Sequence, residues 1–268
     1  MKLVSSAKLR KAQNAIEAMR PYEEQLLGIL ASLQGGMVLS SSKMAQNEDE
    51  RKTIVAIASN SSLCGGFNAN AIAKVRAIRR PGDTVYAIGR KMADAMRKEG
   101  FASPEDFSAL SEHPSYGPAA ALVEKLVADV EAGRTGAVVL VYNHFVSTAR
   151  QEPVVEVLMQ RETPDQVGGD RGAEERDSSP APSYIAPLLE PSRTALLEAL
   201  VPKTRKLKLY AALLDSAAAE HAARTVAMQT ATDNAENLLA ELTLQYNKGR
   251  QQKITSEILD LAGGQAEN

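Results

Sequence analysis

The stretch from Thr204 to Ala262 contains no proline and only one glycine, Gly249. If this stretch is one helix, it is roughly 90 Å long, because an α-helix rises about 1.5 Å per residue. A compact domain built from 268 residues is far shorter than that. The chain is therefore expected to contain a slender helix that extends well beyond any compact part.

Small and apolar residues recur along this stretch at the spacing of a helix–helix seam. One row is Leu207, Leu214, His221, Met228, Ala235 and Leu242, and its companion row is Ala211, Ala218, Thr225, Thr232, Leu239 and Tyr246. Because many of these side chains are small, a partner helix can approach closely along the seam.

The only other stretch long enough to be that partner is residues 2–45. Its apolar positions step by three or four and include Tyr22, Leu26, Ile29, Leu33 and Met37. Pro21 is expected to kink or locally open this helix. The two long helices are predicted to form an antiparallel coiled coil.

Between these helices the pattern changes to alternating strands and helices. Runs rich in β-branched residues predict strands at 53–59, 84–89, 136–145 and 153–159. Intervening stretches predict helices at 69–79, 90–99 and 118–132. This alternation predicts a central Rossmann-like α/β domain with a mostly parallel sheet, and the short link before the last strand makes the final pair antiparallel.

Three segments follow from these patterns. They are an N-terminal coiled-coil helix (1–50), a central α/β domain (51–190) and a C-terminal coiled-coil helix (191–268). Residues 161–183 are polar, charged and rich in glycine, serine and proline, and they predict a flexible loop.

Composition excludes several classes of protein. The formal net charge is −2, and the basic runs 8–13 and 203–208 lack interleaved aromatic residues, so nucleic acid is not expected as a partner. A single cysteine excludes an intrachain disulfide and suits a reducing compartment. The N-terminus lacks the apolar core of a signal peptide, and no apolar run of 18 residues is present.

The segment CGGFN (64–68) lies between a predicted strand and a predicted helix, where phosphate cradles occur. It fits neither the dinucleotide-binding pattern nor the P-loop. A structural bend is therefore the stronger interpretation: Gly65 and Gly66 allow a tight turn, and Cys64 packs as a small apolar side chain.

Catalytic and metal sites are not predicted. No spacing favours His113, His144 or His221 as the base that a nucleophilic Cys64 would need. One cysteine and three dispersed histidines supply no metal-ligand pair. Neither a catalytic residue, nor a cofactor, nor a metal is expected.

The C-terminal stretch 222–264 resembles the last helix of the gamma subunit of F-type ATP synthase. The similarity is carried by ARTVAMQTATDNA (223–235) and YNKGRQQKITSEI (246–258). The segments KLVSSAKLRKAQ (2–13), LCGGFN (63–68) and VYNHFVS (141–147) also resemble that family, in the same order. The resemblance covers nearly the whole chain.

The resemblance implies a rotor that carries out no chemistry itself. Its paired terminal helices would turn inside a ring of three alpha and three beta subunits, beside the epsilon subunit and above the c ring. Proton-driven rotation of the c ring would then change the nucleotide sites of beta in sequence. The implied location is the cytoplasmic face of a bacterial inner membrane, with membrane contact only through the membrane sector.

Several residues match positions with implied contacts. Arg250, Gln251 and Thr255 match positions where the upper shaft bonds to a loop of beta, and an arginine fork suits breakable directional contacts. Met1 and Lys2 match another segment that faces beta. A further set is expected to contact polar loops of the c ring: Lys203, Arg205 and Lys206.

The chain departs from the family pattern in three places. The family has some two dozen residues before the segment matched by Met1, so the start of the first helix is expected to be missing. Asn60, Ser61 and Ser62 replace Asp, Arg and Gly, and the family's ion pairing there is expected to be lost. The 161–183 loop is longer and more charged than usual, while a chloroplast-type thiol insert is not seen.

Two other classes of protein fit the residue patterns alone. One is a coiled-coil adaptor or scaffold with an inserted α/β domain, which would not restore ATPase activity to alpha and beta subunits. The other is a small α/β ligand-binding protein with helical tails, which would bind nucleotide saturably on its own.

Overall fold

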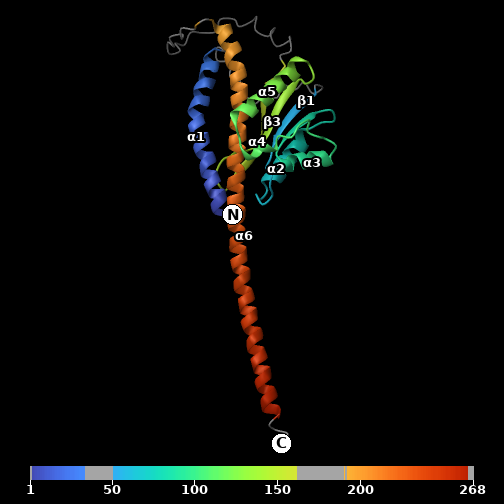
Figure 1. The fold of residues 1–268 in the computed structure, drawn as a ribbon, viewed down its shortest axis with the longest axis vertical. Coiled ribbons are helices and arrows are strands. Elements are labelled where there is room, and N and C mark those ends of the chain that lie inside the picture. Colours follow the sequence, from blue (N-terminus) through green and yellow to red (C-terminus); the bar gives the residue numbers. More distant parts are fainter. Residues whose placement is uncertain (1, 34–50, 162–189, 191, 265–268) are drawn as a thin grey trace, which may run out of the picture.

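A computed structural model describes residues 2–33, 51–161, 190 and 192–264 of the chain. The expectations for Met1, for residues 34–45 of the first helix and for nearly all of the 161–183 loop lie outside this described part. Figure 1 shows a compact α/β domain held beside one very long helix, with a second helix along part of its length.

The sheet has four strands in the order β2-β1-β3-β4. The strands are β1 (Lys52–Ile57), β2 (Thr84–Ile88), β3 (Ala137–Phe145) and β4 (Gln151–Gln160). β1 pairs in parallel with both β2 and β3, whereas β3 and β4 are antiparallel. The predicted strands, the mostly parallel sheet and the final antiparallel pair are confirmed.

Helices cover both faces of the sheet, because successive strand residues point to opposite sides. On one side, Ile54 and Ala56 pack beneath α2 (Phe67–Ile78) and α3 (Arg90–Lys98). On the other side, Val55 and Ile57 contribute to a core shared with α5 (Tyr116–Glu131) and α6 (Arg193–Gly264). A short helix that was not predicted, α4 (Ser108–Glu112), adds Leu110 to that second core.

The helix α6 has 72 residues, which corresponds to about 110 Å. It begins eleven residues before the predicted stretch and continues through Pro202. Leu207 and Leu209 on the following turns are buried against the rest of the chain. Their burial stabilises the helix where the proline weakens it.

The N-terminal helix α1 (Lys2–Leu33) lies antiparallel to the upper part of α6 (Figure 1). It also continues through its proline, Pro21. Leu9 packs against Ala218 and Ala222, where small side chains on α6 permit close approach.

The inward face of α1 differs from the predicted row. Leu26 and Leu33 are buried as predicted, but Tyr22 is 56 % exposed and Ile29 is 49 % exposed. Leu30 is buried in their place. The predicted row failed because both steps of three and of four occur in this sequence, and only packing against α6 selects between them.

The second half of α6 has no partner among the described residues. From Thr230 to Leu259 every residue is exposed, and we call this segment the free half of α6. Lys2, at the start of α1, donates a hydrogen bond to Gln229. Among the described residues, α1 therefore lies antiparallel beside α6 only as far as this point, and the predicted seam beyond it has no partner helix there.

Of the helices that the structure describes, none combines the length and the apolar character needed to cross a membrane.

Replacing Glu23 with glutamine should stabilise the chain at alkaline pH. Burial raises the pKa of Glu23 above its ordinary 4.5, and nearby Glu156 raises it further, against opposing effects of Lys208 and Arg20. The folded state then holds this proton more tightly than the unfolded state, so stability falls as pH rises from about 4.5 through the folded pKa.

The measurement is the melting temperature of wild type and Glu23→Gln at pH 4 and pH 8. The variant should melt higher at pH 8, and the difference should shrink at pH 4. Glu24→Gln is the control, because Glu24 is exposed and its ion pair with Arg20 lies on the surface. Equal shifts for both variants would contradict the argument.

Candidate functional site

Arg250, Gln251 and Thr255 lie exposed on the free half of α6. Gln251 and Thr255 are one helical turn apart, and the Thr255 hydroxyl donates to the Gln251 carbonyl at 2.8 Å. They line a shallow depression along the helix together with Lys248, Gln252, Ser256 and Leu259. Arg250 makes no ion pair with any described residue, so its guanidinium is available to a partner.

Large apolar side chains surround these polar groups. Eight of them on the free half are 43–71 % exposed: Leu238, Leu239, Leu242, Leu244, Tyr246, Ile254, Ile258 and Leu259. At about 100° per residue they point in directions spread around the whole helix rather than along one stripe. A single partner helix would cover one side only. The distribution instead suits a helix enclosed by protein on all sides.

The predicted basic contact set lies near the other end of α6. Lys203 is exposed, whereas Arg205 and Lys206 are half-buried. The Lys206 ammonium donates to Glu124 on α5 at 2.5 Å, and this bond raises the pKa of Lys206. The distance along the helix from Lys203 to Arg250 is about 70 Å. The two predicted contact regions are thus far apart, and Lys206 is engaged within the chain.

The CGGFN bend lies between β1 and α2 and packs against α6. Gly65 has φ +57°, a left-handed conformation that favours glycine, while Gly66 has φ −79° and caps α2. Cys64 is 1 % exposed and packs with Phe67 and two alanines of α6. The predicted bend and the apolar packing of Cys64 are confirmed, although only Gly65 needs its special backbone freedom.

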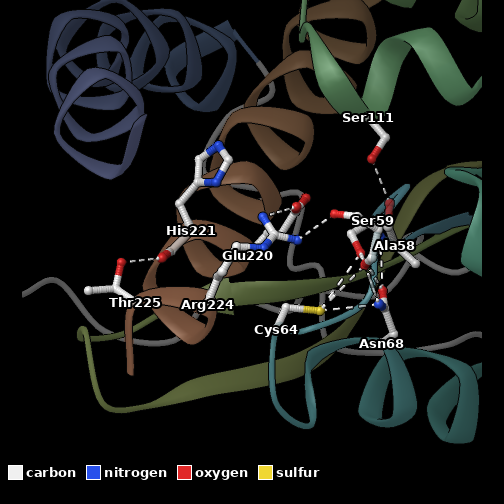
Figure 2. Close-up of polar contacts among 10 residues, drawn as sticks. Ala58, Ser59, Cys64, Asn68, Ser111, Glu220, His221, Arg224 and Thr225 are labelled. Carbon is white, nitrogen blue, oxygen red and sulfur yellow. Dashed lines mark hydrogen bonds and ion pairs between the residues drawn. The ribbon is translucent and has the colours of Figure 1, made fainter. Parts of the chain in front are cut away.

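Polar groups hold this bend in place, as Figure 2 shows. The Asn68 amide donates to the Cys64 sulfur at 3.2 Å and to the Ser59 hydroxyl at 2.9 Å. Ser111 of α4 donates to the Ala58 carbonyl at 2.7 Å. The hydrogen bonds of the Cys64 sulfur within the described residues join it to Ser59, Ser61 and Asn68, and none joins it to a histidine.

Arg224 joins the shaft to the same bend (Figure 2). Its guanidinium contacts Glu220 at 2.6 Å and donates to the Ser61 hydroxyl at 2.8 Å. Glu220 is only 8 % exposed, and burial raises its pKa while Arg224 opposes that shift. Ser61, which replaces an arginine of the family pattern, therefore has a charged partner. The spacing of four residues between Glu220 and Arg224 is a sequence signal for their ion pair. The hydrogen bond from Arg224 to Ser61 has no such signal, because it depends on the fold.

Replacing Ser61 with alanine should lower the free energy of unfolding by about 1 kcal/mol, because one hydrogen bond to a charged group is lost at a partly exposed position. Chemical denaturation measures this change. Ser62→Ala is the matched control, since Ser62 is exposed and its side chain forms no hydrogen bond with a described residue, and it should be neutral. Equal destabilisation by both variants would exclude a specific role for the Ser61–Arg224 bond.

The three histidines form no hydrogen bond with one another in the part of the chain that the structure describes. Burial lowers the pKa of His221 to about 4, so its ring is neutral. His144 Nδ1 lies 2.5 Å from Asp215 of α6, and the His144 side chain is half-exposed whereas Asp215 is mostly buried. Among the described residues, no group of three or more potential ligands could hold a metal ion.

Known proteins resemble this chain over nearly its full length. A family model described as ATP synthase matches residues 1–266. The ATP synthase gamma chain of Phocaeicola vulgatus is 44 % identical over 272 residues, which cover 98 % of this chain and 91 % of the relative. The gamma chain of Bacteroides fragilis is 42 % identical with the same coverage.

Solved structures share the fold. A chain of the Euglena gracilis mitochondrial ATP synthase, in a structure of OSCP, F1 and c-ring, has a TM-score of 0.63 at 21 % identity, covering 97 % of this chain and 94 % of that one. A chain from the central stalk and c-ring of the Tetrahymena thermophila enzyme has a TM-score of 0.60 at 20 % identity, covering 87 % and 97 %. From these similarities the chain belongs to the ATP synthase gamma chain family, whose members form the rotor of the central stalk.

Proposed function

We propose that this chain transmits rotation between a proton-driven c ring and the nucleotide sites of beta subunits, without catalysing a reaction itself. The observation that carries the proposal is the free half of α6, whose apolar side chains point in all directions around one helix. Such a surface needs an enclosing sleeve. A ring of three alpha and three beta subunits would supply one.

The two ends of α6 receive different roles in this proposal. Arg250, Gln251 and Thr255 would bond to a loop of beta from inside the ring, and Lys2 would face beta at the level where α1 begins. Lys203 and Arg205 would face the polar loops of the c ring. Lys206 would act there through its bond to Glu124, which fixes α5 to the shaft.

In this proposal the α/β domain is attached rigidly to α6. Its core joins the sheet to α6 through Leu209 and Leu213, and Arg224 joins the first bend to the same helix. The epsilon subunit would bind beside this domain. The assembly would lie on the cytoplasmic face of a bacterial inner membrane, with this chain touching the membrane only through the membrane sector.

Co-assembly with bacterial alpha and beta subunits tests the proposal. The purified complex should hydrolyse ATP at least tenfold faster than alpha and beta alone. A variant with Leu239, Leu242 and Tyr246 changed to glutamine should assemble poorly, because each loses apolar burial in the sleeve. The control changes Glu241, Thr243 and Gln245 to alanine on the same turns. Failure of the wild-type chain to join the complex would overturn the proposed function.

A further inference from the structure

A cluster of ionisable side chains lies where α1, α6 and the last two strands of the sheet meet. It brings three carboxylates together but only one amine and one imidazole, so its charge depends on how many protons it holds. We call it the junction cluster, and its members are Glu23 of α1, Tyr142 and His144 of β3, Glu156 of β4, and Lys208 and Asp215 of α6.

Direct bonds hold two of the three carboxylates. Glu156 accepts a hydrogen bond from the Tyr142 hydroxyl at 3.0 Å and lies 3.3 Å from the Lys208 ammonium. Burial raises the pKa of Tyr142, so its hydroxyl keeps the proton that it donates. Asp215 lies 2.5 Å from His144 Nδ1 and accepts a backbone N–H at the end of β3 at 3.0 Å. Burial raises the pKa of Asp215, and these two bonds oppose the shift.

Glu23 is the carboxylate without such a bond. It is half-buried, and it forms no hydrogen bond or ion pair with a described residue. Burial raises its pKa most, and the negative charge of Glu156 raises it further. Lys208 and Arg20 oppose the shift, but the Arg20 guanidinium lies on the surface, paired with a carboxylate of its own helix. An ionised Glu23 is therefore more stable in water than in this position.

The middle of α1 is weakly held at this level. Of residues 10–25, all of which the structure describes, none is fully buried, whereas Leu9 and Leu26 on either side are. Pro21 removes a backbone hydrogen bond of the helix two residues before Glu23. A small change in free energy at Glu23 can therefore move this part of α1 while the rest of the chain stays folded.

We propose that the junction cluster is a proton-dependent clamp on the middle of α1. While Glu23 holds its proton, it lies beside Glu156 and α1 packs against the sheet and α6. Once that proton leaves, the helix around Pro21 moves outward so that the carboxylate reaches water. A proton taken up by His144 acts in the same direction as one on Glu23, because it adds a positive charge next to Asp215.

The clamp makes the shaft sensitive to pH. Where α1 moves outward, α6 alone resists twisting, and one helix resists it less than two packed helices do. Coupling between rotation and ATP hydrolysis should then weaken on the alkaline side. This consequence rests on the proposed rotor function, whereas the clamp itself belongs to the chain alone.

Hydrogen exchange in the isolated full-length chain tests the clamp. The contribution of Glu23 is present at low pH and is lost as the pH rises from about 4.5 through its raised pKa. Amide protection of residues 19–26 is measured at pH 5 and pH 8, relative to the exchange rate of an unstructured chain at each pH. In the wild type it should fall about tenfold more than the protection of α2.

Two variants and one control decide the outcome. Glu23→Gln should remove most of this excess loss, because an amide carries no charge at either pH. Glu156→Gln should reduce it, and the double variant should do no more than Glu23→Gln alone, since both act at one contact. Glu24→Gln is the control: it removes the same charge from an exposed neighbour and should keep the excess loss.

The inference is overturned if the wild type shows no excess loss, or if Glu23→Gln and Glu24→Gln behave alike. In the assembled complex at pH 8, Glu23→Gln should pump more protons per ATP than Glu24→Gln, and equal pumping would contradict the consequence for coupling. The exchange measurements need no partner subunit. Failure of the chain to assemble with alpha and beta would thus reject the proposed function without touching the clamp.

Discussion

Replacing Leu213 with alanine is expected to lower the free energy of unfolding by about 3 kcal/mol, within the range found for buried leucines. Leu213 is 1 % exposed and belongs to the core that joins α6 to the sheet. Removing its side chain leaves a cavity at the attachment between shaft and domain. The loss should appear as a lower denaturation midpoint with an unchanged slope.

Leu244→Ala is the matched control for this substitution. It removes the same atoms from a leucine that is 71 % exposed on the free half of α6, and it should change stability by less than about 0.5 kcal/mol. In the assembled complex Leu244→Ala should also become costly, because Leu244 would then lie in the sleeve. If Leu213→Ala were as mild as Leu244→Ala in the isolated chain, the shaft would not be attached as described.

Replacing Gly249 with proline is expected to break the free half of α6. Proline lacks the N–H that would bond to the Gln245 carbonyl, and its ring clashes with that carbonyl, at a cost of about 3 kcal/mol or more. No element that the structure describes packs against the helix at this point. Amide hydrogens around and after residue 249 should lose protection from exchange, and coupling between ATP hydrolysis and proton pumping should fall more than hydrolysis itself.

Gly249→Ala tests the same position in the opposite direction. A Cβ there would meet nothing within 4 Å, so the space is open. Alanine favours an exposed helix over glycine by about 1 kcal/mol, and protection should rise. A proline variant with the helical content and coupling of wild type would show that the free half does not act as a rigid shaft.

The sequence predicted the elements of this fold well where their patterns were strong. The four strands, the antiparallel last pair and the long C-terminal helix follow from β-branched runs and from the absence of proline. The inward face of α1 was predicted incorrectly at Tyr22 and Ile29, because its apolar residues allow more than one register. Only contact with α6 decides which leucines are buried.

The short helix α4 was missed for a related reason. No helix was predicted between residues 100 and 117, yet Leu110 is 4 % exposed in the core shared with α5 and α6. One buried leucine in a five-residue helix leaves no periodicity to detect.

The residues of the candidate site could likewise be predicted only in part. Arg250, Gln251 and Thr255 were found only through family resemblance, since nothing in their local pattern distinguishes them from solvated helix residues. The bond between Arg224 and Ser61 joins positions 163 residues apart, and no local pattern reports such a contact. The apolar residues around the free half were visible in the sequence. Their exposure was not, because it depends on where α1 lies.

Direct observation of rotation tests the central claim most directly. Complexes of this chain with alpha and beta subunits are fixed to a surface through beta, and a visible probe is attached to α3 through a cysteine at position 98 (Lys98→Cys). Cys64 is buried and should not compete for the label. On addition of ATP, the probe should turn in one direction and pause at three positions, each one third of a turn apart. A probe that stays stationary while the same complexes hydrolyse ATP would contradict the account.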